Sequence, residues 1–131
     1  MHFLKGLAVL VCMLALVSML VSAAAAEEKN LGIHDVSRIT FVAPMRVGTT
    51  LLPAGDYVVR HTMEGEEHIM VFQAVRGKTP EVKVKCTLVP LAQKAEQTQT
   101  IYQLNAANER VLQELVIRGD MAKHVFEAAH N

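Results

Sequence analysis

Residues 81–89 read Glu-Val-Lys-Val-Lys-Cys-Thr-Leu-Val, and this run decides the fold class. Apolar and polar side chains alternate along it, so one face of an extended chain carries Val82, Val84, Cys86 and Leu88. Glu81, Lys83, Lys85 and Thr87 lie on the other face. Alternation of this kind is typical of a β-strand that packs one face on a core and exposes the other to water.

Shorter runs with strand-like patterns lie on both sides of this stretch. They are separated by turn signals such as Gly48-Thr49, Pro53-Ala54-Gly55 and Glu64-Gly65. No helical pattern long enough for a parallel crossover intervenes, so sequential strands are expected to pair as antiparallel hairpins. The sequence predicts one all-β antiparallel domain at 37–128, with seven or eight short strands forming a β-sandwich or a small up-and-down barrel.

Residues 108–118 fit two interpretations. Val111, Leu112, Leu115 and Val116 follow helical spacing, whereas Val111, Leu115 and Ile117 also fit a strand. We favour the strand, with Gly119-Asp120 as a hairpin turn into a last strand at 121–126.

The first 26 residues have the three parts of a secretory signal peptide. Lys5 precedes an apolar run from Leu7 to Val21, and the small residues 22–26 then provide a cleavage site. An uncleaved membrane anchor is the alternative, because the apolar stretch is nearly long enough to span a bilayer. We expect cleavage, a flexible tail at 27–36, and a protein in the periplasm or outside the cell with no stable membrane span.

The charge balance of the mature chain argues against several classes of partner. Of 13 Lys and Arg residues only Lys5 lies in the signal, which leaves 12 against 13 Asp and Glu. A near-neutral chain without Trp has neither the basic surface nor the aromatic platform typical of nucleic-acid binding. The expected partner is therefore a protein or another component of the envelope.

The most distinctive motif surrounds the turn at 52–57, where Leu52, Pro53, Ala54, Gly55 and Tyr57 form an LPAG-x-Y segment. Together with Val47-Gly48 and Val59, it resembles the VG-x-x-x-LPAG-x-Y-x-V core of a group of uncharacterised exported bacterial proteins. The resemblance implies a small all-β domain and no catalytic activity. The turn also resembles one in carboxypeptidase-regulatory-like β-sandwich modules, which are mostly accessory or adhesive domains.

Two histidines are the only candidates for a metal site. A two-residue turn at Glu64-Gly65 would place His61 directly opposite His68 on one face of a hairpin. Zinc normally takes three or four protein ligands, and the sequence offers no third ligand at a fixed spacing. We therefore interpret His61 and His68 as structural, with no metal and no cofactor expected.

Signal removal leaves Cys86 as the single cysteine, and the strand pattern predicts a buried, unreactive thiol. No acid–base pair or nucleophile motif can be nominated, so no catalytic residues are expected. The sequence favours a non-enzymatic binding or structural module of the periplasm or cell envelope. A small-molecule carrier with an internal cavity, or a weak metal-binding domain using His61 and His68, is the alternative.

Overall fold

A computed structural model describes residues 32–127. The expected signal peptide at 1–26, most of the expected tail and the last four residues lie outside this part of the chain. Between residues 32 and 127 every regular element is a strand. Within the same range, no helix is long and apolar enough to cross a membrane.

Nine strands follow one another along the described chain. They are β1 (Val36–Phe41), β2 (Met45–Val47), β3 (Thr50–Leu52), β4 (Gly55–Glu64), β5 (Glu67–Ala74), β6 (Val82–Pro90), β7 (Gln99–Leu104), β8 (Arg110–Val116) and β9 (Ala122–Phe126). The single all-β domain expected from the sequence is confirmed, with more strands than the seven or eight anticipated. The ambiguous stretch 108–118 contains strand β8, which was the favoured interpretation.

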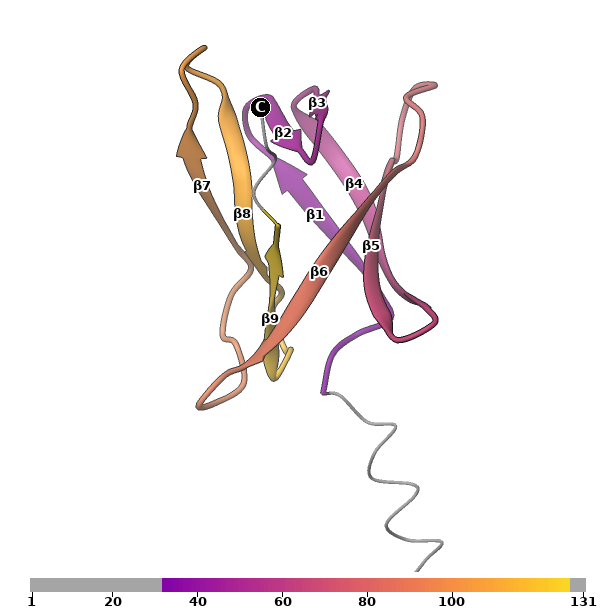
Figure 1. Cartoon of the computed structure of the whole chain (residues 1–131), viewed down its shortest axis with the longest axis vertical. Helices are drawn as coiled ribbons and strands as arrows, with labels where there is room; N and C mark the ends of the chain where they lie inside the picture. Colours follow the sequence, from indigo (N-terminus) through magenta and orange to yellow (C-terminus); the bar gives the residue numbers. More distant parts are fainter. Residues whose placement is uncertain (1–31, 128–131) are drawn as a thin grey trace, which may run out of the picture. The chain divides into compact units, whose positions relative to one another are not determined.

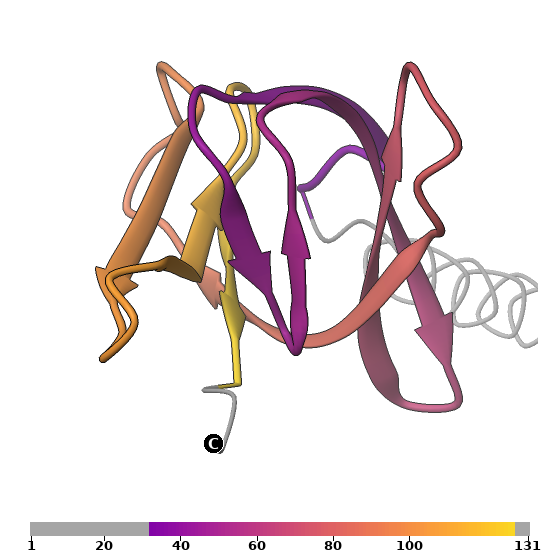
Figure 2. The same ribbon diagram turned by 90° about the horizontal axis from the view of Figure 1, so that it is seen from above.

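All nine strands belong to one sheet, in the order β1-β4-β5-β6-β9-β8-β2-β3, and β7 pairs with β8 off this path. Every pair is antiparallel except β2 with β8, which meet in parallel at Arg46 and Val111. The strands wind around a shared interior (Figures 1 and 2). Because only 42–44 join β1 to β2, this short link also draws the two end regions of the sheet together.

Aromatic side chains from four strands fill the centre of this interior. Phe41 packs against Tyr57 and Phe72, with ring centroids 5.2 and 6.3 Å apart, and Phe72 packs against Phe126 at 5.9 Å. Aliphatic residues from β2, β3 and β8 complete the same buried cluster. Burial of these rings supplies much of the hydrophobic stabilisation, because aromatic side chains remove large apolar areas from water.

The described end of the expected tail lies against the domain. The carbonyl oxygen of Gly32 accepts a hydrogen bond from the amide of Met121 at 2.6 Å, and that of Asp35 accepts one from His61 at 2.8 Å. Strand β1 begins at Val36, one residue before the expected domain boundary. Residues 32–36 are therefore attached to the β8–β9 turn and to β4.

Candidate functional site

The LPAG-x-Y segment forms a corner between β3 and β4. The Tyr57 hydroxyl donates a hydrogen bond to the carbonyl oxygen of Pro53 at 2.6 Å, while its ring lies in the core against Phe41. Leu52 is fully buried, and Gly55 has a φ of 148°, a conformation that a side chain would strain. The motif residues thus cooperate to set the direction in which the chain enters β4.

A surface depression of about 350 Å³ lies beside this corner, lined by residues of the motif together with Ala74, Arg76 and Thr79. Its carboxylate, Asp56, accepts a hydrogen bond from the Thr40 hydroxyl at 2.6 Å. This bond, followed by the nearby charge of Arg38, holds the pKa of Asp56 below its usual value. The Asp56 carboxylate is therefore already bonded to side chains of β1. We interpret the corner as a structural feature that connects β3 to β4.

The β4–β5 hairpin differs in register from the expected one. Glu64 pairs with Glu67, so Gly65 and Glu66 form the turn, with a φ of 62° at Gly65. His61 then pairs with Met70 rather than with His68. Moving the turn by one residue shifts the pairing by two, which keeps each side chain on its face. His61 and His68 therefore remain diagonal neighbours, with Nε2 and Nδ1 2.9 Å apart.

The same region of the interior contains further polar groups. The ring centroid of His124 lies 5.8 Å from that of His61, and its Nδ1 lies 3.9 Å from the Cys86 sulfur. On its other side, His124 Nε2 is 3.6 Å from an Asp120 carboxylate oxygen. We call His34, His61, His68, Cys86, Asp120 and His124 the interior polar cluster, in which the His34 side chain is 56% exposed and reaches the buried Asp120 from the surface.

Two members of the interior polar cluster, Asp120 and His124, are fully buried. Oδ1 of Asp120 accepts a hydrogen bond from the backbone amide of His34 at 3.0 Å, and it lies 2.6 Å from Nδ1 of the same histidine. Asp120 Oδ2 and His124 Nε2 have no hydrogen-bond partner within residues 32–127. Buried polar atoms are normally bonded, whereas these two atoms face each other at 3.6 Å, which is beyond hydrogen-bond distance.

Burial shifts the pKa values of three members of the interior polar cluster, His61, Cys86 and His124. Desolvation, opposed by the charge of Asp120, lowers the pKa of His124 to about 4, and desolvation with the neighbouring His68 also lowers the pKa of His61. Burial raises the pKa of the Cys86 thiol to about 11. At neutral pH the thiol is thus protonated and the His124 imidazole is neutral.

Asp120, His124 and Cys86 contact one another in the sequence acid, base and nucleophile, as in a catalytic triad. Their pKa values and exposure differ from those of a reactive triad. A reactive cysteine needs a lowered pKa and access to substrate. Here the thiol pKa is raised, the imidazole pKa is lowered, and Cys86 is only 7% exposed. The arrangement therefore favours a structural polar cluster over nucleophilic catalysis.

We expect Cys86 to react slowly with thiol reagents in the native protein and rapidly after denaturation. Its side chain lies on the inner face of β6, and its raised pKa leaves little thiolate to react. Replacement by alanine should cost about 1 kcal/mol, the lower end for a small cavity. Ellman's reagent measures both rates on one sample, and native labelling as fast as denatured labelling would contradict the burial of this thiol.

The structure shows no third ligand that would complete a metal site at His61 and His68 within residues 32–127. Within residues 32–127, no group of three or more His, Cys, Asp or Glu side chains is arranged to hold a metal ion. The 2.9 Å contact between the His61 and His68 rings gives both nitrogens a partner without a metal.

Sequence reasoning missed Asp120, His124 and His34 as members of the cluster. One signal was available for His124, because it shares its strand face with Ala122 and Phe126, both apolar. That alternation predicts an inward imidazole on β9. Nothing local to Asp120 indicates its contact with His34, which is 86 residues away in sequence.

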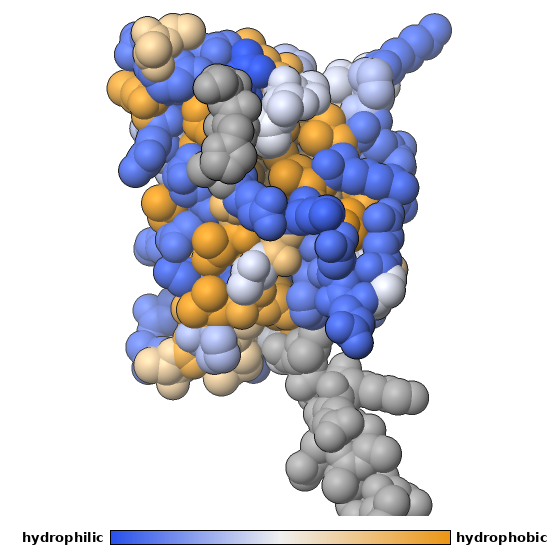
Figure 3. Space-filling model, viewed as in Figure 1, coloured by the Kyte–Doolittle hydropathy of each residue, from blue (hydrophilic) through white to orange (hydrophobic). Residues whose placement is uncertain are grey.

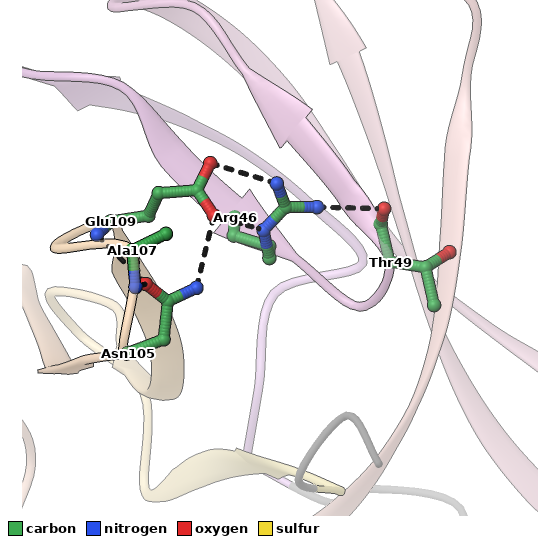
Figure 4. A network of polar contacts seen from close by, with 5 residues as sticks. All are labelled: Arg46, Thr49, Asn105, Ala107 and Glu109. Carbon is green, nitrogen blue, oxygen red and sulfur yellow. Dashed lines mark hydrogen bonds and ion pairs between the residues drawn. The ribbon is translucent and has the colours of Figure 1, made fainter. Parts of the chain in front are cut away.

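A second polar network fixes the tip of the β7–β8 hairpin (Figure 4). Arg46 of β2 donates two hydrogen bonds to the Glu109 carboxylate, at 3.1 and 2.8 Å, and a third to the Thr49 carbonyl oxygen. The Asn105 amide donates to the same carboxylate, and its side-chain oxygen accepts from the backbone amides of Ala107 and Glu109. This clamp ties the hairpin to the β2–β3 turn through a bidentate ion pair.

The comparisons with known proteins add no family to this description. No protein-family model, curated protein or solved structure matches the chain.

Proposed function

We propose that this protein is an exported module of the periplasm or cell envelope that binds another protein and has no enzymatic activity. The observation that carries the proposal is the occupied interior. Aromatic and aliphatic side chains fill the space inside the sheet, and polar contacts join His34 to Asp120, His61 to His68 and Cys86 to His124. An interior of this kind stabilises a scaffold and leaves the outer surface for recognition.

The N-terminal sequence supports the exported location, because a short apolar run ends in small residues before a charged stretch. N-terminal sequencing of the protein from an exporting cell should begin at Glu27 or Ala25. A chain that begins at Met1 and stays in the membrane fraction would contradict export and support the retained anchor.

A small-molecule carrier is the second candidate, and one observation favours it. The depression beside Pro53–Tyr57 has a volume of about 350 Å³, which reaches the lower end of ligand pockets, about 300 Å³. It is a surface hollow, however, and a carrier would bury most of its ligand.

Native mass spectrometry of the protein purified from its own periplasm distinguishes these functions. A bound polypeptide supports the binding module, whereas a bound mass of a few hundred daltons supports the carrier. Turnover of a substrate by the purified protein, lost in a variant of the interior polar cluster, would overturn the non-enzymatic proposal.

A further inference from the structure

Strand β7 lies outside the main path of the sheet. Within residues 32–127 it pairs only with β8, whose other side is occupied by β9 and β2. Figure 1 shows β7 as the outermost strand of its side of the domain. Its second edge therefore carries backbone groups available to another strand.

The side chains of β7 do not protect that edge. Five of its six residues are exposed, and three of them are large and apolar: Ile101 and Tyr102 at 38% and Leu104 at 59%. Apolar surface lies among polar surface on this side of the molecule (Figure 3). The sequence Gln-Thr-Ile-Tyr-Gln-Leu contains no charge and no proline, the two residue classes that usually prevent edge pairing.

The other outer strands are less suited to pairing. β1 carries Arg38, whose guanidinium lies beside Asp56, and β3 has only three residues. A β-bulge interrupts the pairing of β7 with β8, and its unpaired residue is Gln113 of β8. Strand β7 itself is therefore regular. The Arg46–Glu109 clamp meanwhile fixes the end of the hairpin that contains β7 (Figure 4).

We propose that β7 pairs antiparallel with β7 of a second copy of this chain, which extends the sheet across a two-fold axis. A second copy fits this edge because β7 carries no charged side chain to set against its own copy, and the nearby Arg110 guanidinium of β8 lies over the Tyr102 ring, 4.6 Å from its centre. If the two-fold axis passes through Ile101, the two Ile101 side chains lie opposite each other. Gln99 of one copy then lies opposite Gln103 of the other, and Thr100 lies opposite Tyr102. Every opposed pair is therefore uncharged. The mature chains, with 12 cationic and 13 anionic residues, also have almost no net repulsion.

The size of the contact sets the expected strength of this dimer. One pair of six-residue strands buries less surface than the interfaces of stable complexes, which bury roughly 800 Å² on each partner. We therefore expect a reversible dimer with a dissociation constant in the micromolar range. This inference goes beyond the proposed function, because a second copy is a partner distinct from an envelope protein.

Sedimentation velocity over a concentration series of the exported protein tests the dimer. Ile101→Lys should weaken association at least tenfold, because the axis places two lysines opposite each other. Val42→Lys is the matched control: it adds the same charge at an exposed apolar residue just after β1 and should leave association unchanged. Far-UV circular dichroism confirms that both variants are folded.

Amide hydrogen exchange provides a second test that needs no variant. The amides of 99–104 that point away from β8 should become more protected as the protein concentration rises, and those of β1 should not. A protein that stays monomeric to several hundred micromolar overturns the inference, and so does a dimer weakened by Val42→Lys rather than by Ile101→Lys. A monomer that carries a bound polypeptide in native mass spectrometry would overturn only the dimer and leave the proposed function intact.

Discussion

Replacement of Tyr57 by alanine is expected to lower the free energy of unfolding by about 3–5 kcal/mol, as for other large aromatic residues removed from a core. The Tyr57 ring is 1% exposed and packs on Phe41, so its loss leaves a cavity at the centre of the aromatic cluster. A typical domain has only about 5–15 kcal/mol of stability, so this single change removes a large fraction of it.

Tyr57→Phe is the matched control, because it keeps the ring and removes only the hydroxyl bonded to Pro53. We expect it to cost about 1 kcal/mol, the net contribution of one hydrogen bond. Urea unfolding followed by circular dichroism gives both values. Equal losses for the two variants would show that the corner depends on its hydrogen bond rather than on ring packing.

The second large effect is a loss of stability in acid. Between pH 7 and pH 4 the free energy of unfolding should fall by up to about 3 kcal/mol as His124 titrates beside the buried Asp120. Its pKa is lowered from 6.5 to about 4 in the folded protein, so in this window the unfolded chain binds a proton that the folded chain does not. Stability is therefore complete above pH 6.5 and decreases as the pH falls towards 4. His61, whose pKa is also lowered, acts in the same direction.

Urea unfolding at several pH values measures this dependence, and His124→Gln removes the titrating group while keeping a polar side chain. The slope of stability against pH should become shallower in the variant. NMR titration of the His124 imidazole in the wild-type protein gives an independent reading. A folded pKa near 6.5, or an unchanged slope in His124→Gln, would contradict this assignment.

The local sequence determined which side of strands β1 and β6 faces the core. Alternation placed Cys86 with Val82 and Val84 on β6, and Ile39 with Phe41 on β1, and the structure has these faces inward. The reason is geometric, because side-chain direction in a strand has a period of two and needs no information from elsewhere in the chain. The all-β class followed from the same pattern.

Only the tertiary structure decided the register of the hairpins and which strands and polar groups distant in sequence meet. A one-residue difference in the position of the Gly65 turn changed the partner of His61 from His68 to Met70. β9 lies between β6 and β8, a placement that brings His124 beside Cys86. Asp120 meets His34, and Arg46 meets Glu109, across 86 and 63 residues of sequence. Such pairings depend on turn geometry and on the packing of the whole interior, whereas the alternation that reveals a strand is contained in the strand itself.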